Sequence, residues 1–575
     1  DKCIRDGVID AVGPDLSAPE GAQVMDAAGK LITPGFINMH SHSDCSAAMY
    51  PNMESTLGQG ITTEFAGHCG LGVAPVQHSW LYMFPEKKAF TKVMPEPPGG
   101  INPYNAYLVP TQRLREPFAQ TYGQELDWTT YGQFLEHLRR VGLGANLAVV
   151  AGQAQIRLQA MGTDYHRDAT ETEIAAMEGA LSEAMDGGAL GLSLGLDYEP
   201  GLFAGREELL RLMKLVAARG GIVTAHTRSR SHPYYGHAQS FLDGLREFLD
   251  LGRESGVRIH VSHIQNGYNV TPAHDGLIRA AVAKTLEELD RARQAGVNVT
   301  WDVIPKYAYG PFHYPMAASL FQPYVERCGG CAAFSRALTL PDFRRQVVEE
   351  IRTGRHPSQG VFTRFDPQAD PAWDTRYRFT RVQRAGCVGK TIREAAQGAD
   401  SLELLLDVLT EDPYAAMISL GRRPEHTPDR DAFVARTEAT IGLDTWTLDY
   451  DAALSEGDLP LECGSPATYE GMTVFLETER DKGAAIEETI RKLTGNAART
   501  LGLTDRGFVS QGLAADLLVL DWEHFSAREN LADPRHGPQG LDYVLVAGQI
   551  AVDHGVHTHV RSGTVLGPEH RKGEN

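Results

Sequence analysis

Short apolar segments alternate with longer amphipathic segments through the middle of this chain, and this alternation restricts the fold more than any other feature. The apolar segments are rich in Val, Ile and Leu and bounded by turn residues, as buried strands are. They are ANLAVVAG (145–152), GALGLSLGL (188–196), GGIVTAHTR (220–228), GVRIHVSHI (256–264), GVNVTWDVI (296–304) and ATIGLD (439–444). Helical spacing of apolar residues marks 169–188 and 271–296 as helices between them. Such alternation predicts parallel βα units. With LITPGFI and ITTEFAG as the first two strands the count is eight, which favours an α/β fold, a TIM-like (β/α)8 barrel.

The two ends of the chain carry a different pattern. The pattern is typical of short strands joined by turns. It occurs in DGVIDAVG and VMDAAGKLITPGF at the start and in 507–525 and 543–556 at the end. We predict that they form one small β-sandwich in two halves, 1–32 and 501–565. The barrel domain would occupy 33–500, and 566–575 would be a tail. A connection of about 311–438 separates the last two barrel strands, and one that long is typical of a functional lid or a subdomain.

Composition excludes several classes of protein. The chain has 575 residues, 42% of them hydrophobic, which is enough for a large core. A formal charge of −20 repels phosphate backbones and argues against nucleic acid as a partner. Uncharged apolar runs of ~18 residues are absent from the sequence, so we expect no membrane span. Seven scattered cysteines, an odd number, do not suggest a disulfide framework, and we expect a cytoplasmic location.

Metal-binding side chains follow the predicted strands. His40 and His42 are two residues apart, so in a strand both imidazoles project from the same face. Cys69, His226, His263 and Asp444 follow other strands. Imidazole, thiolate and carboxylate all bind divalent metals, and a parallel barrel brings the ends of its strands into one ring. Each of these side chains alone could be an ordinary core residue, but six of them at strand ends predict a site for one or two metal ions.

The segments around these side chains resemble a known family. The likeness is to motifs of the amidohydrolase superfamily, and it is strongest to the N-acyl-D-amino-acid deacylase (D-aminoacylase) family. The similar segments are PGFINMHSHSD, GITTEFAGHCGLGVAP, GALGLSLGLDYEPG, TAHTRS and GVRIHVSHI. LTGNAARTLGLTDRGFVSQGLAADLLVLD and YVLVAGQIAVDHG extend the likeness to the C-terminal part. It covers most of 1–305 and 439–560 and is weak between them, as in a divergent member. The cysteine after the second strand is its most specific sign. The family's first half-sandwich starts with one more strand, which implies that the natural chain begins before Asp1.

The resemblance implies a role for each ligand. Cys69, His226 and His263 would hold a tight zinc, and His40, His42 and Asp444 a second, weaker metal position. Asp444 would also be the general acid and base. Zinc lowers the pKa of bound water to about 7 and polarises a carbonyl, and a carboxylate can pass the proton of the attacking water to the leaving nitrogen. Thiolate ligation favours zinc over magnesium.

Three positions depart from the family pattern and bear on the substrate. Gln265 stands where the family typically has a lysine for the substrate carboxylate, and Ser465-Pro466-Ala467 replaces a His-Pro-Arg turn whose arginine pairs with the same group. His68 stands where the family usually has Asn, and it could be an extra ligand, a hydrogen-bond donor or a loop support. Losing both cations removes charge-assisted hydrogen bonds to a carboxylate. We infer that the substrate lacks a free α-carboxylate or binds it elsewhere.

Other side chains could take part in substrate binding. Arg228, Arg230 and Lys306 are replacements for the lost cations, although the two arginines could equally form structural ion pairs. Tyr198 matches a family position near the acyl pocket, with core packing as the competing interpretation. Asp302 ends the seventh strand and could support the metals or simply bond a loop.

These observations predict a zinc-dependent hydrolase of a carbon–nitrogen amide bond that deacylates an N-acyl amino acid or amine. Two alternatives stay open. One is a superfamily enzyme that acts on a cyclic amide or imide, or that catalyses a non-hydrolytic lyase reaction. The other is an inactive, amidohydrolase-like binding protein, although such relatives typically lose ligands. The expected partner is a small-molecule amide, and the oligomeric state, including a homo-oligomer, is open.

Overall fold

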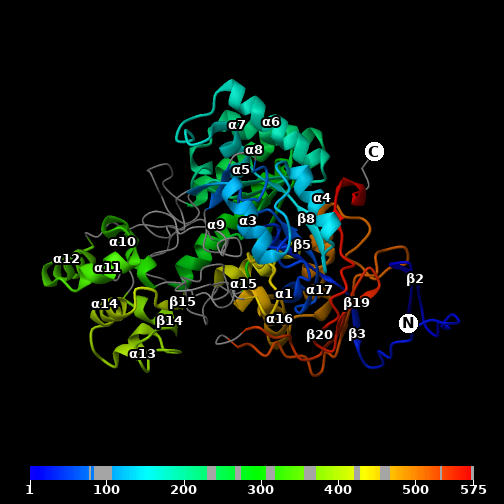
Figure 1. The fold of residues 1–575 in the computed structure, drawn as a ribbon. Coiled ribbons are helices and arrows are strands. Elements are labelled where there is room, and N and C mark those ends of the chain that lie inside the picture. Colours follow the sequence, from blue (N-terminus) through cyan, green and yellow to red (C-terminus); the bar gives the residue numbers. More distant parts are fainter. Residues whose placement is uncertain are drawn as a thin grey trace.

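The structure is a computed structural model of the chain (Figure 1). It describes residues 1–76, 79–82, 107–228, 241–265, 274–305, 317–354, 371–419, 428–452, 466–530 and 534–571.

Parallel strands form the centre of the molecule in two sheets. One sheet has the order β21-β8-β5-β4 and the other β16-β13-β12-β11-β10-β9. Their bounds are β4 (Phe36–Ser41), β5 (Ile61–Ala66), β8 (Asn146–Val149), β9 (Ala151–Gly152), β10 (Gly191–Gly195), β11 (Ile222–His226), β12 (Arg258–Val261), β13 (Val299–Val303), β16 (Thr440–Ile441) and β21 (Val565–Leu566). All the described pairings within both sheets are parallel, as the alternating pattern predicts.

Two links join these sheets. On one side the chain runs from β8 into β9 through the single residue Val150, whose N–H donates to the Ala66 carbonyl at 3.0 Å. On the other side, the Asp444 N–H just after β16 donates to the carbonyl of His40 in β4 at 2.8 Å, and the His42 N–H donates to the carbonyl of Thr445 at 2.6 Å. The strand order therefore runs from β4 through β5, β8/β9 and β10–β13 to β16 and back to β4.

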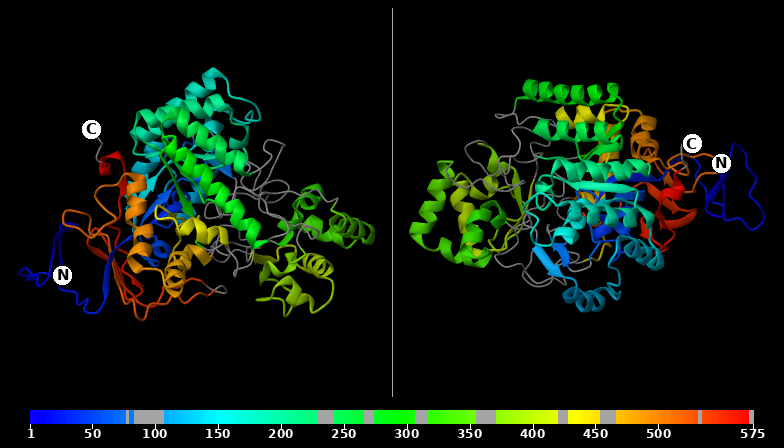
Figure 2. Two further views of the ribbon diagram at one scale, coloured as in Figure 1. Left: turned by 180° about the vertical axis from the view of Figure 1, so that it is seen from behind. Right: turned by 90° about the horizontal axis from the view of Figure 1, so that it is seen from above.

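Helices follow the strands and pack on them (Figures 1 and 2). They are α4 (Tyr131–Val141), α5 (Gln153–Met161), α6 (Glu171–Asp186), α7 (Arg206–Ala218), α8 (Phe241–Ser255), α9 (Asp275–Gln294), α15 (Pro428–Val434), α16 (Pro466–Asp481), α17 (Ile486–Leu493) and α18 (Gly495–Leu501). Smaller elements are α1 (Glu54–Leu57), α3 (Gln112–Tyr122) and the antiparallel pair β6 (Ser79–Tyr82) and β7 (Tyr107–Pro110). The segments predicted as helices are α6 and α9, and α6 begins at a capping box formed by Thr170 and Glu173.

Both ends of the chain contribute to one antiparallel sheet of order β20-β19-β18-β17-β3. β3 (Leu31–Pro34) comes from the start, and β17 (Leu517–Leu520), β18 (Leu541–Val546), β19 (Gln549–Asp553) and β20 (Val556–His557) come from the end. The hairpin β1 (Lys2–Arg5) and β2 (Val8–Val12) packs Ile9 against Ala515 and Leu517 of this region. One detail differs from the sequence analysis: β21, placed there at the border of sandwich and tail, pairs with β8 in the central sheet.

We predicted LITPGFI as one strand, but it contributes to two strands in different sheets. β3 pairs with β17 in the terminal sheet, and after Gly35 the chain enters β4 of the central sheet. The chain passes Thr62 so closely that a Cβ at position 35 would lie 2.1 Å from Thr62 Oγ1. Glycine at this position therefore lets one apolar segment serve both sheets.

Gly35→Ala should lower the free energy of unfolding by about 1–3 kcal/mol, because the added methyl overpacks against the buried Thr62. Urea denaturation measures this change. Gly13→Ala is the matched control, because its Cβ would meet only Leu16 at 3.6 Å, and it should be near neutral. Equal stability of the two variants would show that the approach of Gly35 to Thr62 does not matter.

The long connection before the last barrel strand contains its own core. Its described elements are α10 (Gln322–Cys328), α11 (Cys331–Leu338), α12 (Pro341–Arg352), α13 (Ile392–Ala396), α14 (Ser401–Glu411), β14 (Tyr377–Arg381) and β15 (Ala416–Ser419). Phe321, Phe334, Phe379 and Leu405 belong to a buried cluster separate from that of the central strands. These elements lie together at one side of the molecule (Figure 1), so this connection has the character of a subdomain rather than of a bare loop.

Among the described residues, no helix combines the length and the apolar character needed to cross a lipid bilayer.

Candidate metal centre

The six predicted ligands meet at the C-terminal ends of the central strands. His40 is in β4 and His42 directly follows it, Cys69 comes three residues after β5, and His226 ends β11. His263 lies two residues after β12, and Asp444 three residues after β16. Five of these side chains are at most 4% exposed and His42 is 12% exposed at its side chain. Parallel pairing thus brings together residues that are up to 404 positions apart in the sequence.

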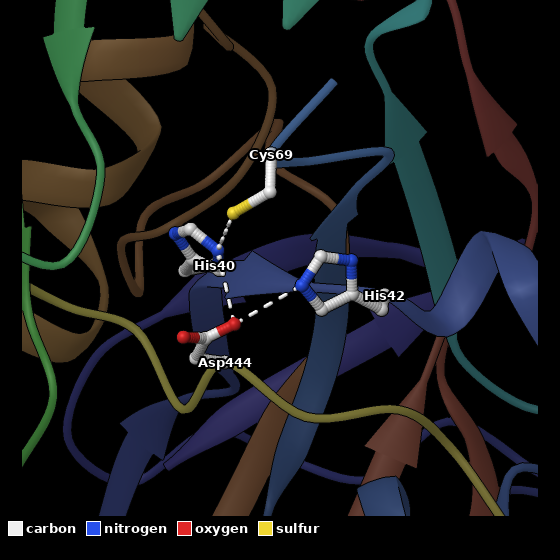
Figure 3. Close-up of side chains that lie close together, drawn as sticks. All are labelled: His40, His42, Cys69 and Asp444. Atoms are coloured by element: carbon white, nitrogen blue, oxygen red, sulfur yellow. Dashed lines mark hydrogen bonds and ion pairs between the residues drawn. The ribbon is translucent and has the colours of Figure 1, made fainter. Parts of the chain in front are cut away.

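Four of the side chains form one group (Figure 3). Asp444 Oδ1 lies 3.0 Å from His42 Nε2 and 3.3 Å from His40 Nε2. Cys69 Sγ lies 3.4 Å from the same His40 nitrogen. One ligand atom from each of the four residues lies within 4.8 Å of those of the other three, which is a spacing that a single ion could span.

Cys69, His226 and His263 form a second group of the same kind. Cys69 Sγ is 3.4 Å from His263 Nε2, and His263 Nε2 is 4.0 Å from Asp444 Oδ2. The thiol of Cys69 therefore belongs to both groups and lies between them.

The electrostatics of the cluster suit a bound cation. Burial by itself lowers the pKa of His40, but the carboxylates of Asp444 and Asp302 outweigh it and raise this pKa well above its usual value. Burial also lowers the pKa of His42, and contacts with Asp444 and Cys69 raise it to about 10. Two carboxylates and a thiol thus stabilise positive charge in a buried space. Protons on the histidines or a bound metal ion can carry that charge. Because imidazole, thiolate and carboxylate are the ligands zinc prefers, the donor set fits zinc.

Three of the predicted ligands have a backbone dihedral angle φ that is unusual for a residue other than glycine. Cys69, His263 and Asp444 have φ values of 60°, 38° and 57°, in the left-handed region that costs a non-glycine residue free energy. Each conformation is supported by a hydrogen bond from nearby groups. Tyr198 Oη donates to the Cys69 carbonyl at 2.7 Å, the His263 N–H donates to Asp302 Oδ1 at 2.9 Å, and the Asp444 N–H donates to the His40 carbonyl. Such strain at the ligands is typical of functional sites.

Two carboxylates, those of Asp302 and Asp197, contact ring nitrogens of the predicted ligands. Asp302 Oδ2 contacts His40 Nδ1 at 3.3 Å and His260 Nε2 at 3.0 Å. Asp197 Oδ2 contacts His226 Nε2 at 3.3 Å. The sequence analysis did not single out Asp197. Its position was a signal in the sequence, because Asp197 is two residues after the end of β10, and the predicted ligands likewise lie at or after the ends of their strands.

Comparisons with known proteins agree with this geometry. Residues 23–300 match the model of an amidohydrolase family. N-acyl-D-glutamate deacylase of Alcaligenes xylosoxydans xylosoxydans is 26% identical over 98% of this chain and 91% of its own length. D-aminoacylase of the same organism is 29% identical over 98% of this chain and 92% of its own. The chain is therefore similar to amidohydrolases over 23–300 and to N-acyl-D-amino-acid deacylases over nearly its full length.

Solved structures show the same fold. A D-aminoacylase crystal structure superposes with a TM-score of 0.65 at 23% identity and covers 98% of this chain and 94% of that one. An N-acyl-D-glutamate deacylase from Bordetella bronchiseptica, complexed with zinc and a phosphonate inhibitor, superposes with a TM-score of 0.64 at 23% identity and the same coverage. Both structures therefore share the overall fold of this chain.

The side chains predicted to touch substrate differ in their surroundings. Tyr198 is buried, with its ring 5.0 Å from that of His226. His68 is buried, its ring is 4.1 Å from that of His40, and its Nδ1 is 3.4 Å from Ser262 Oγ. Burial, the largest cause, and the charge of His40 lower the pKa of His68 well below its usual value. Gln265 is partly exposed and lies two residues after His263 in the sequence.

Arg228 is held by groups of the protein itself. Its guanidinium donates to Glu247 at 2.9 Å and to the carbonyls of Leu202 and Ala204 at 2.6 and 3.1 Å. These contacts match the structural ion pair that was the other interpretation of Arg228, and a role in substrate binding stays a prediction. Arg230, Lys306 and Ser465 lie outside the described residues, whereas Ala467 is buried in α16.

Proposed function

We propose that this chain is a zinc-dependent amidohydrolase, which cleaves an amide bond and deacylates an N-acyl amino acid or amine. The observation that carries the proposal is the convergence of six potential ligands, five of them buried, in two groups that share Cys69. The deacylases to which the chain is similar over nearly its full length support the choice of a linear amide. We further infer that the two central sheets and their two links form a closed (β/α)8 barrel, with the connection of about 311–438 inserted before its last strand.

In this proposal the two ligand groups hold two metal positions. Cys69, His226 and His263 would hold the tighter zinc, and His40, His42 and Asp444 a second metal. When bound, the zinc supplies an activated water and a Lewis acid for the scissile carbonyl. The thiol between the groups favours zinc, because burial alone would raise the pKa of Cys69 but the charges of His40 and His263 lower it well below its usual value.

Asp444 is the proton carrier of the proposed reaction. Burial raises its pKa, but His40 and His42 outweigh burial and hold the pKa of this carboxyl well below its usual value. Asp444 is therefore ionised and able to accept a proton from the attacking water. The same carboxyl then delivers the proton to the leaving nitrogen, and its strained backbone and its two histidine contacts fix where that oxygen lies.

The substrate in this proposal lacks a free α-carboxylate or binds it away from the usual position. Gln265 is neutral and Ala467 is a buried methyl, so neither can form the charge-assisted hydrogen bond that a lysine or an arginine would. Arg228 lies two residues after the end of β11, but its guanidinium already bonds Glu247 and two carbonyls.

A substrate panel on zinc-loaded protein tests the proposal. N-acyl-D- and N-acyl-L-amino acids, their C-terminal amides and simple N-acyl amines are compared by kcat/KM, with metal analysis of the same preparation. We expect kcat/KM of the amidated substrates to lie within about 10-fold of that of the free acids, because neither Gln265 nor Ala467 can form a charge-assisted hydrogen bond that amidation would remove. In an enzyme that has such a bond, its loss would lower kcat/KM by ~10- to 100-fold. Protein treated with a chelator is the control, and it should be inactive.

Other outcomes of this panel would favour other functions. A preference of more than about 100-fold for free D-amino-acid derivatives would show that a carboxylate site exists despite Gln265 and Ala467. Turnover of cyclic amides or imides only would favour that branch of the superfamily. Metal binding without turnover of any amide would contradict the proposed reaction.

A further inference from the structure

Asp302 accepts hydrogen bonds from three residues at the base of the candidate metal centre. It is the last residue but one of β13, and its side chain is fully buried. Oδ2 faces His40 Nδ1 at 3.3 Å and His260 Nε2 at 3.0 Å, and Oδ1 accepts from the backbone N–H of His263 at 2.9 Å. Two of these partners are ligands, one from each of the two groups.

We propose that Asp302 is a positioning residue that couples the two metal positions, orienting the ring of His40 in one and the backbone of His263 in the other. This inference rests on the metal centre of the proposed function. It goes beyond it, because Asp302 belongs to neither ligand group and would act through its contacts with these two ligands.

The contact with His40 decides which ring nitrogen is available for a metal. A histidine that donates Nδ1–H to a carboxylate leaves Nε2 unprotonated and fixes the plane of the ring. In His40 the free Nε2 then faces Cys69 Sγ at 3.4 Å and Asp444 Oδ1 at 3.3 Å. Without Asp302, the ring could rotate or adopt the other tautomer, with a proton where the metal should bind.

The contact with His263 stabilises a strained backbone. His263 has a φ of 38°, and the bond from its N–H to Asp302 holds the peptide in the orientation that turns Nε2 toward Cys69. Because one carboxylate makes both contacts, a shift of Asp302 would move the ligands of both positions together.

The surroundings of Asp302 leave it little freedom. His260 is fixed on its other side by Thr300 Oγ1, 2.8 Å from Nδ1. The chain passes over Asp302 at Gly442, where a Cβ would lie 2.6 Å from Asp302 Oδ1 and 2.4 Å from the Cβ of His40. The carboxylate is thus held between its three donors by close packing and not by a flexible loop.

Two substitutions separate the two contacts. In Asp302→Asn, Oδ1 can still accept from the His263 N–H, but an NH2 group replaces the oxygen that faces His40 and His260. We expect this variant to bind metal at the His40 position ~10- to 100-fold more weakly and to keep the affinity of the Cys69–His226–His263 position. Asp302→Ala removes both contacts and should weaken both positions.

Zinc titrations against a chelating competitor measure the dissociation constants of both positions, and cobalt substitution reports Cys69 ligation through its thiolate charge-transfer band. Thr440→Val is the matched control: it removes a buried hydrogen bond of 2.7 Å to the Trp301 carbonyl, on the strand next to Asp302. It should lower the melting temperature without changing either dissociation constant. If Asp302→Ala does not fold, the isosteric Asp302→Asn decides.

Wild-type affinity at both positions in Asp302→Asn would overturn the inference, and so would equal weakening of both positions. A wild-type protein that binds a single metal would also overturn it, because there would be no second position to couple. A wild-type protein with two metals but no amidase activity would contradict the proposed function and leave the role of Asp302 standing.

Discussion

Asp444→Asn should keep zinc bound at the Cys69–His226–His263 position and lose about 10²- to 10⁴-fold in kcat. The amide has the size of the carboxylate and an oxygen that can face His42, whose Nε2 is 3.0 Å from Asp444 Oδ1. It cannot accept and return a proton near neutral pH. The three-residue metal group does not include Asp444, so that position should stay occupied. Steady-state kinetics and metal analysis of one preparation measure both effects.

Asp412→Asn is the matched control for this substitution. Asp412 is also a buried aspartate, but it lies in the connection before β16, where it accepts from the N–H groups of Tyr414 and Gln383 at 3.1 Å. Its amide variant should lose stability and keep full turnover. If Asp444→Asn retained wild-type turnover with zinc bound, the proton-carrying role assigned to Asp444 would be wrong.

The ligand positions could be predicted because they follow from two local rules. Side chains two residues apart share a face of a strand, which pairs His40 with His42. Parallel strands place their C-terminal ends on one side, which brings Cys69 toward His263. Neither rule needs knowledge of side-chain packing. The convergence of distant residues was therefore predictable from the strand pattern alone.

The division of LITPGFI between two sheets was not predictable in the same way. Both halves of the segment are apolar, so hydrophobic pattern does not separate β3 from β4. The cause is a close approach of Gly35 to Thr62, which lies 27 positions away and becomes a neighbour only when β4 and β5 pair. Contacts of this kind depend on the assembled sheet.

The supporting carboxylates show the same limit. Asp302 is one of many aspartates in an acidic chain, and its partners His40 and His263 are 262 and 39 positions away. At least one helix of the long connection does carry a local sequence signal. Asp400 caps α14 through the N–H groups of Leu402 and Glu403, and the sequence D-S-L-E-L-L-L carries that signal.

Cys69→Ser should weaken metal binding at both positions, by more than about 100-fold, and abolish most activity as a consequence. The thiol lies 3.4 Å from His40 Nε2 and 3.4 Å from His263 Nε2, so it belongs to both ligand groups. Its lowered pKa makes it a thiolate, whereas a serine hydroxyl stays protonated and is a poor ligand for zinc. Metal analysis and competition titration of the purified variant measure the loss.

The pattern of loss distinguishes the role of Cys69 from that of Asp444. Asp444→Asn should leave zinc at one position and remove turnover, whereas Cys69→Ser should remove the metal first, so excess zinc should restore part of its activity. Cys331→Ser is the matched control, because Cys331 is a buried cysteine in α11, within the separate core of the long connection. It should bind metal like the wild type. Undiminished affinity at both positions in Cys69→Ser would mean that the thiol is not a ligand, and that the two groups do not share an atom.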